Sequence, residues 1–217
     1  MASGKAAGWA YCEEYGLQTS PFGEDGLMER ARERASELGV APVHPGEGQL
    51  LRLLASSVQA TSVVEIGTGA GVGSLYLLAG MDPAGVLTTI DPEFENQRTA
   101  RQSFTEAGIR SARVRTIAGQ PRDVIVRLTE NAYDMVTFLA DAPHAQDLLD
   151  HAVRLLRPGG LLAITHTLYH DRVADPATRD ADTTRVRQLL QAVQESEDLH
   201  SAMVPSGDGV LAAVRRR

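Results

Sequence analysis

The sequence has little cysteine and no long apolar run. Its one cysteine, Cys12, excludes an intrachain disulfide framework and the zinc modules built from several cysteines. No segment approaches the roughly 20 apolar residues that span a bilayer, and the N-terminus lacks an apolar stretch of signal-peptide length. We therefore expect a cytoplasmic protein, because a chain with one thiol and no targeting segment suits a reducing compartment.

Positive charge is also scarce. The chain has 21 lysines and arginines against 28 acidic residues, which gives a formal net charge of -7. A surface that follows a phosphate backbone or an anionic membrane needs clustered Lys and Arg, and the terminal run 215–217 is too short to form one. We therefore expect neither nucleic acid nor membrane as a partner. The 217 residues, 43% hydrophobic and 23% charged, fit one globular domain.

The chain alternates strand and helix patterns. Six short β-branched or apolar runs predict strands, at 62–66, 86–90, 114–118, 135–139, 161–165 and 210–214. Helical periodicity fills most of the intervals and also precedes the first run, at 26–38 and after Pro45. Such alternation produces right-handed crossovers, so the sequence predicts a doubly wound, mainly parallel α/β sheet. We expect 1–24 to be an N-terminal extension with a short helix near 9–15, and 25–217 to be one domain.

A glycine-rich segment follows the first predicted strand. Glu65, Gly67, Gly69 and Gly71 are spaced as E-x-G-x-G-x-G ahead of a helical pattern. Glycines at a strand-to-helix turn let the backbone approach a ligand closely, although a tight turn without a ligand has the same composition. The dinucleotide pattern G-x-G-x-x-G does not fit this register, which disfavours NAD. A carboxylate at Glu65 would repel a pyrophosphate and attract a ligand with an ammonium and a sulfonium, which indicates S-adenosylmethionine.

Asp91 closes the second predicted strand. Its carboxylate is placed to accept hydrogen bonds from both ribose hydroxyls of an adenosine. It is equally suited to cap the helix that begins near Pro92, and the two roles are compatible.

Six segments of the chain, in their order and spacing, carry a family resemblance. They are "VVEIGTGAGVGSLYL", "GVLTTID", "AGIRSARVRTIAGQP", "YDMVTFLAD", "LLRPGGLLAI" and "VPSGDGVLAAV". Over roughly residues 25–217, the chain resembles the class I S-adenosylmethionine-dependent O-methyltransferases related to catechol and caffeoyl-coenzyme A O-methyltransferases, in their actinobacterial branch. The resemblance implies a Rossmann-like seven-stranded sheet with helices on both faces, and a homodimer.

The resemblance also implies a pocket for S-adenosyl-L-methionine. Position by position, it falls on Val43, Glu65, Gly67, Thr68, Gly69, Gly73, Asp91, Pro92, Gly119, Gln120, Pro121 and Leu139. Trp9, Tyr11 and Tyr15 of the N-terminal extension are candidates for a subunit interface or a flap over the acceptor, although ordinary packing is the commoner role of such aromatic residues.

The chain departs from the family where metal-dependent members bind a divalent cation. Their motif I-D-A-D-K after the fourth strand corresponds to residues 138–142, so Leu139 replaces the metal-binding Asp and Ala142 replaces the Lys. Thr165 and His166 stand in place of an Asp-Asn pair after the fifth strand. Leucine cannot coordinate Mg²⁺, which needs oxygen ligands, so we expect no divalent metal.

Histidines near the predicted strand ends offer other chemistry. A set of His166, His144 and Asp141 would suit Zn²⁺ or Fe²⁺, although a first-turn surface position is the simpler interpretation of His144. His166 follows a central strand, where open α/β sheets bind ligands. Its ordinary pKa of about 6.5 suits a general base, and the alternative is a loop histidine held by backbone hydrogen bonds. Asp141 is the second candidate catalytic residue, and His170 is expected to be exposed or to face the acceptor.

These observations predict metal-independent transfer of a methyl group from S-adenosylmethionine to a hydroxyl of a small acceptor, with aromatic acceptors among the candidates. Without a metal, the acceptor must be acidic itself or lose its proton to a base such as His166. The alternative is a non-catalytic relative that keeps the cofactor pocket as a sensor or assembly partner, because the metal ligands and the Lys are lost together. A nucleotide-dependent oxidoreductase is disfavoured by Glu65 and by the glycine register.

Overall fold

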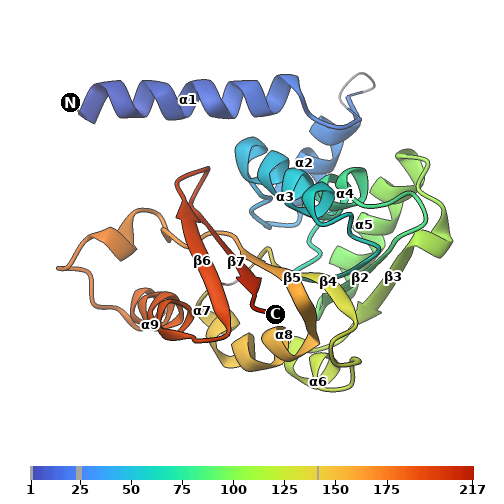
Figure 1. Cartoon of the computed structure of the whole chain (residues 1–217). Coiled ribbons are helices and arrows are strands. Elements are labelled where there is room, and N and C mark those ends of the chain that lie inside the picture. The colour runs from blue at the N-terminus through green and yellow to red at the C-terminus, as the bar shows by residue number, and fades with distance from the viewer. Residues whose placement is uncertain (1, 23–25, 141) are drawn as a thin grey trace.

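The computed structural model describes residues 2–22, 26–140 and 142–217. Within these ranges, seven strands form one sheet in the order β3-β2-β1-β4-β5-β7-β6 (Figure 1). Their bounds are β1 (Ser62–Ile66), β2 (Val86–Asp91), β3 (Val114–Ala118), β4 (Tyr133–Phe138), β5 (Leu156–Ile164), β6 (Leu199–Val204) and β7 (Val210–Arg215). β1 to β5 run parallel, and β7 pairs antiparallel with both β5 and β6. The prediction of a doubly wound, mainly parallel α/β sheet is confirmed.

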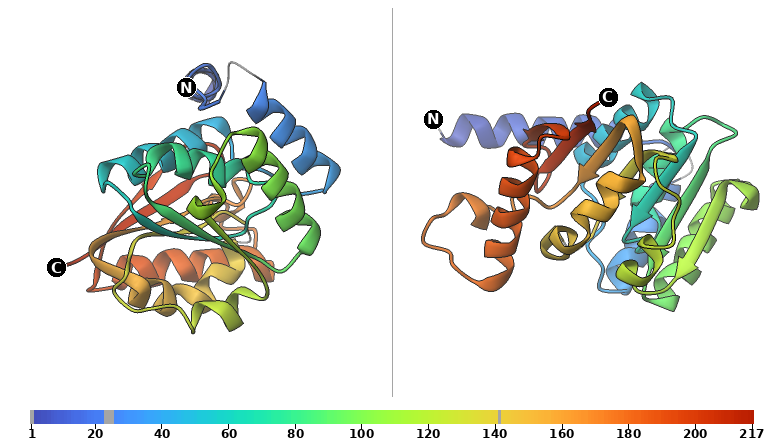
Figure 2. Two further views of the ribbon diagram at one scale, coloured as in Figure 1. Left: turned by 90° about the vertical axis from the view of Figure 1, so that its right-hand side faces the viewer. Right: turned by 60° about the horizontal axis from the view of Figure 1, so that its bottom comes forward.

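Helices cover both faces of this sheet (Figure 2). They are α1 (Ala2–Gln18), α2 (Leu27–Glu37), α3 (Pro45–Ser57), α4 (Val72–Gly80), α5 (Phe94–Glu106), α6 (Pro121–Ile125), α7 (Ala142–Ala145), α8 (Leu149–Leu155) and α9 (Ala181–Glu195). One apolar core lies between one face of the sheet and the helices α2, α3, α4 and α5. A second core lies between the other face and the helices α6, α7, α8 and α9. Successive strand residues point to opposite faces, so Val63 enters the first core and Val64 the second. The central strands β1 and β4 therefore have buried residues on both faces.

β6 is the strand that no sequence pattern indicated. It lies at the edge of the sheet, where it pairs only with β7. Only Leu199 among its six residues is buried. Its sequence consequently shows neither an apolar run nor a regular alternation, which are the signals from which a strand is predicted.

The interval between β4 and β5 does not hold one continuous helix. It is divided into α7, a 3-10 turn at Gln146–Leu148, and α8. Leu156 pairs with Tyr133 and starts β5 five residues before the predicted strand. A register shift between Tyr133 and Met135 lets this early part of β5 join the sheet.

α1 is longer than the predicted short helix and projects from the body of the molecule (Figures 1 and 2). Near its end it lies against α3, where Gln49 Nε2 donates to the carbonyl oxygen of Gly16 (3.2 Å). Nearer its start, Trp9 and Tyr11 are 49% and 69% exposed. Among the helices described, none is both long enough and apolar enough to cross a membrane. The N-terminal extension is thus helical, and its role as an interface stays a prediction.

Candidate active site

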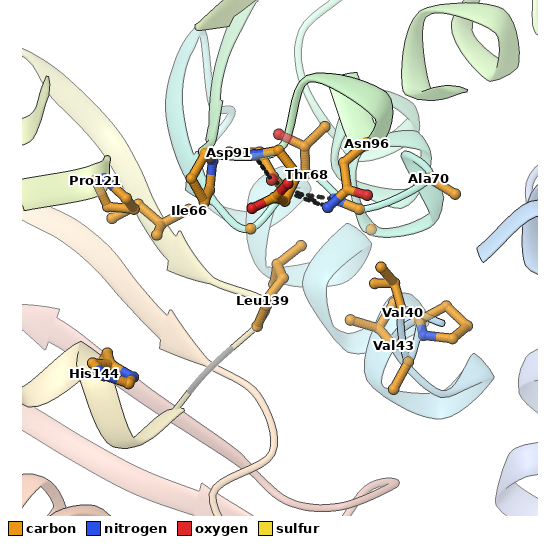
Figure 3. Close-up of a pocket in the computed structure, with 18 of the residues that line it drawn as sticks. Val40, Val43, Ile66, Thr68, Ala70, Asp91, Asn96, Pro121, Leu139 and His144 are labelled. Atoms are coloured by element: carbon orange, nitrogen blue, oxygen red, sulfur yellow. Dashed lines mark hydrogen bonds between the residues drawn. The ribbon is translucent and has the colours of Figure 1, made fainter. Parts of the chain in front are cut away.

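A cavity of about 570 Å³ opens at the carboxyl ends of β1 to β4 (Figure 3). Open α/β sheets bind ligands at this edge, because the loops that follow the parallel strands converge there. Ten of the predicted cofactor residues line it: Val43, Gly67, Thr68, Gly69, Gly73, Asp91, Pro92, Gln120, Pro121 and Leu139. Glu65 and Gly119 are absent from its lining. The walls also include Val40, Asn96 and Leu148, which the sequence did not indicate, and His144, which the sequence indicated only as a candidate metal ligand.

The glycine loop after β1 follows the path that its sequence predicts. Gly67, Gly69 and Gly71 have φ angles of 92°, 50° and 88°, in the region that side chains disfavour. A Cβ atom on Gly67 would lie 2.7 Å from the Cβ of Ala140 and 2.9 Å from its backbone nitrogen. The residues after β4 therefore lie in close contact with the glycine loop. Only glycine at position 67 lets the backbone of the loop and the backbone of Ala140 border the same cavity.

Asp91 joins the glycine loop to the start of α5. Its Oδ2 accepts a hydrogen bond from the backbone N–H of Gly69 (3.0 Å), and its Oδ1 accepts from the N–H of Glu93 (2.9 Å). Asn96 Nδ2 donates to both carboxylate oxygens, at 3.1 and 3.3 Å (Figure 3). Asp91 thus holds the first residues of α5 and lines the cavity, and its role in binding ribose stays a prediction. Gly119 does not line the cavity, but its N–H donates to the Asp91 carbonyl oxygen (3.0 Å) and so supports a residue that does.

Glu65 lies behind the cavity wall and is fully buried. Ser74 Oγ donates to its Oε2 (2.5 Å), and Oε1 has no hydrogen-bond partner among the described residues. The Thr89 hydroxyl lies close enough to favour the ionised carboxyl, but it is engaged with Thr68 at 2.6 Å. Burial dominates and raises the pKa of Glu65 to about 7. This carboxyl is therefore a buried acceptor that a positive charge nearby would stabilise.

Leu139, directly after β4, lines the cavity (Figure 3). Its backbone N–H donates to the carbonyl oxygen of Ile66 (2.9 Å), which fixes the tip of β4 against β1. A Cβ atom on Gly73 would overlap Leu139 Cδ1 and would lie 3.5 Å from Glu65 Oε1. The absence of a side chain at Gly73 hence leaves room for Leu139, and it leaves only the helix backbone between Glu65 and the cavity.

The family's metal positions hold no oxygen-rich donor set. Leu139 is apolar, and the hydroxyl of buried Thr165 donates to the Phe138 carbonyl oxygen (3.4 Å). Within 2–22, 26–140 and 142–217, no three His, Cys, Asp or Glu side chains are placed to hold a metal ion. His144 lines the cavity from α7, whereas His166 is absent from the lining. Asp141, the other predicted catalytic residue, lies outside the described residues.

His166 lies in the loop after β5, beside the tips of β4 and β5. Its side chain is 16% exposed, and Nδ1 is 3.6 Å from Oδ2 of Asp208, in the turn between β6 and β7. Burial lowers the pKa of His166, the Asp208 carboxylate raises it, and His44 lowers it further. His170 is exposed, as predicted, and its Nδ1 is 3.8 Å from the same carboxylate oxygen. The sequence assigned no site role to Asp208 or His44, because 38 or more residues separate Asp208 from His166 and His170 in the chain.

Three comparisons with known proteins agree with this architecture. The family model described as "O-methyltransferase" matches residues 20–216. A protein named as a candidate O-methyltransferase from Mycobacterium ulcerans is 48% identical over 192 residues, which cover 88% of this chain and 86% of that protein. A crystal structure from Corynebacterium glutamicum superposes with a TM-score of 0.86 at 34% identity, covering 97% of this chain and 98% of that one. The O-methyltransferase TomG of tomaymycin synthesis from Streptomyces achromogenes, solved with S-adenosylmethionine, gives 0.80 at 27% identity, covering 88% and 90%.

Proposed function

Because this chain belongs to the S-adenosylmethionine-dependent O-methyltransferase family, we propose that it methylates a hydroxyl of a small acceptor without a divalent metal. The observation that carries the second part is the apolar Leu139 at the family's first metal position, on the cavity wall. Thr165 and His166 stand at the other two positions. Mg²⁺ needs several oxygen ligands in near-octahedral geometry, which these three side chains do not supply.

The cavity suits the cofactor of this family in size and in charge. Its volume of about 570 Å³ lies within the usual range for ligand pockets. The Asp91 carboxylate would hold the ribose hydroxyls, because two charged oxygens at the end of β2 retain free acceptor positions. Gln120, Pro121 and His144 would border the adenine, while the buried and unpartnered Oε1 of Glu65 favours a positive charge near Gly73. When bound, S-adenosylmethionine supplies a methyl group on a positively charged sulfur.

The protein's own residues then position the acceptor and remove its proton. Phe138 pairs with Ile164, so the residues that follow β4 and β5 leave the sheet side by side. Leu139 and Ala140 form an apolar wall at this place, which keeps water from the reacting atoms. His166 follows Thr165, whose N–H donates to the carbonyl oxygen of Phe138, directly before Leu139 (3.0 Å). Burial lowers the pKa of His166, so its ring is neutral and ready to accept a proton at neutral pH. We assign His166 as the general base.

Calorimetric titration with S-adenosylmethionine, followed by a methyl-transfer assay, tests this proposal. We expect the wild-type protein to bind S-adenosylmethionine and not NAD. Asp91→Ala should weaken binding at least about 10-fold, because it removes hydrogen bonds to a charged acceptor. Glu95→Ala is the matched control, since Glu95 is exposed, pairs with Arg98 at 2.8 Å and is not among the residues that line the cavity. Equal affinity of Asp91→Ala and wild type would contradict this assignment.

The assay uses a panel of phenols and other hydroxylated acceptors, with and without a chelator. Formation of S-adenosylhomocysteine should be unchanged by the chelator and by added Mg²⁺. Loss of activity with the chelator, restored by a metal, would contradict metal independence. Binding without turnover on any acceptor would instead favour the non-catalytic alternative, which the simultaneous replacement of Lys and metal ligands makes the second candidate.

We also propose that the chain forms a homodimer through α1. An isolated helix of this length is only marginally stable in water, yet Trp9, Tyr11, Tyr15 and Leu17 are all about half exposed or more. Aromatic residues of this kind are enriched in subunit interfaces. A second copy of this chain is therefore the proposed partner of the projecting helix.

A further inference from the structure

We propose that Asp208 is the positioning residue of the base: it holds the His166 ring with Nδ1–H toward the carboxylate and leaves Nε2 to take the acceptor's proton. This inference rests on the proposed function. Asp208 Oδ2 and His166 Nδ1 are 3.6 Å apart, and the two side chains are only 10% and 16% exposed. A carboxylate at one ring nitrogen selects the tautomer that carries the proton on that nitrogen. The distance is slightly longer than a hydrogen bond, and catalytic hydrogen bonds are often long without bound substrate.

Asp208 is itself held in place from several sides. Its backbone N–H donates to Oε1 of buried Glu47 (3.1 Å), and its carbonyl oxygen accepts from the N–H of Leu168 (2.7 Å). Its Oδ1 accepts from the N–H of His170 (2.7 Å). Oδ2 is buried and has no hydrogen-bond partner among the described residues. The one free acceptor of a fixed carboxylate is thus the atom that faces His166.

The loop that carries His166 is fastened to the same turn. The N–H of Thr167 donates to the carbonyl oxygen of Gly209 (3.1 Å), directly after Asp208. His166 has a φ of 58°, a backbone conformation that residues other than glycine adopt mainly where their surroundings fix it. Such constrained residues cluster at active sites. The β6–β7 turn and the loop after β5 therefore form one unit, in which His166 and Asp208 keep a constant relation.

The pair provides a complete path for the proton. His166 Nε2 takes the proton of the acceptor hydroxyl as the oxygen forms its bond to the methyl carbon and the carbon–sulfur bond breaks, leaving its electron pair on sulfur. The positive charge that was on sulfur is then carried by the imidazolium of His166, next to the Asp208 carboxylate. The carboxylate stabilises this charge and does not itself accept the proton, which is its role in other histidine–carboxylate pairs.

The charges around His166 set the pH range of this base. Asp208 from the β6–β7 turn raises its pKa, whereas burial, His44 from the start of α3 and His170 from its own loop lower it. Glu47 of α3 lies behind Asp208 and holds it through the backbone. Burial is the largest effect, so the ring stays neutral at neutral pH, and the carboxylate keeps it from losing basicity altogether.

NMR of histidine side chains in the full-length protein tests the arrangement without any acceptor. We expect long-range proton–nitrogen spectra of nitrogen-15-labelled protein to show neutral His166 with the proton on Nδ1, assigned by comparison with His166→Gln. Asp208→Asn should lower the pKa of His166 and change its tautomer. His170→Ala is the matched control, because it removes the exposed neighbour of the same carboxylate and should leave the tautomer unchanged. A proton on Nε2 in the wild type would overturn the proposal, and this result needs no variant that might misfold.

Kinetics with any acceptor that is turned over give the second readout. Asp208→Asn should lower kcat at least about 10-fold while KM and the affinity for S-adenosylmethionine change less than about 2-fold, and the acid limb of the pH profile should move to lower pH. Unchanged kcat in Asp208→Asn would overturn this inference alone, because turnover would still support the proposed function. Absence of cofactor binding in the wild type would overturn the proposed function, whereas the NMR result would still report the histidine–carboxylate pair.

Discussion

At the scale of single residues, Glu65 lowers the stability of the folded protein, and the same buried carboxyl favours binding of a positively charged ligand. A carboxyl that is fully buried, with one oxygen unpartnered, is costly to ionise. Its pKa is raised from 4.5 to about 7. Between these two values the folded protein binds more protons than the unfolded chain, so stability falls as pH rises through this range. Above about pH 7 the full cost is present unless a cation lies nearby.

Glu65→Gln should therefore stabilise the free protein and weaken its cofactor binding. We expect the variant to gain about 1 to 3 kcal/mol in unfolding free energy at pH 8, and this gain should shrink toward zero as pH falls to about 4.5. Denaturant unfolding from pH 4.5 to 8 measures it. Glu95→Gln, on the exposed surface of α5, is the control with no comparable trend. A gain that is independent of pH would show that the charge of Glu65 is not its cause.

Much of the cofactor end of the site was predictable from residues. Glycines with positive φ and an acidic residue at the end of β2 have local causes, and the structure places them as expected. Asn96, His144 and the His166–Asp208 contact were not predictable, because they depend on how distant segments meet. Asp208 approaches His166 only once β7 has inserted beside β5, and no spacing within the sequence reports that event.

At the scale of elements, α3 and α4 pack unusually closely. A Cβ atom on Gly80, the last residue of α4, would overlap the carbonyl oxygen of Arg52 in α3. Because that atom belongs to the backbone of a helix, it cannot move without shifting α3 as a whole. α3 also carries Glu47, which holds Asp208. The spacing of these two helices consequently affects both the core and the site.

Gly80→Ala should therefore destabilise the protein by about 1 to 3 kcal/mol, the usual cost of overpacking a core. Gly8→Ala in α1 is the matched control: a Cβ atom there would meet nothing within 4 Å, so higher helix propensity should make it neutral or slightly stabilising. Thermal and urea unfolding of both variants measure the difference. Equal stability of the two would mean that α3 and α4 adjust freely to each other.

The prediction of helices and strands is wrong where tertiary contacts, and not local sequence, decide the structure. Central strands and amphipathic helices have strong patterns, and they lie within a few residues of the predicted ranges. β6 pairs with β7, and the start of β5 pairs with Tyr133. Neither pairing changes the local composition. The length of α1 was underestimated because its exposed half has no apolar face on which periodicity could be recognised.

At the scale of the whole molecule, the projecting α1 is the proposed subunit interface. Replacement of Trp9 by Asp should convert a dimer into a monomer, because a charge would have to be buried in an apolar contact. Sedimentation velocity at several protein concentrations measures this. Val126→Asp is the control, since Val126 is 48% exposed and lies after α6, far from α1 in the fold. A wild-type protein that sediments as a monomer at all concentrations would contradict the proposed dimer.

The order of the strands has a consequence for synthesis of the chain. β7 is made after every other strand, yet it lies between β5 and β6. Until residues 210–215 leave the ribosome, the hydrogen-bonding edge of β5 stays open, and β6 has no strand to pair with. An open edge next to an apolar core is prone to pair with other chains. The interval between synthesis of β5 and of β7 is therefore when a nascent chain most needs protection from aggregation.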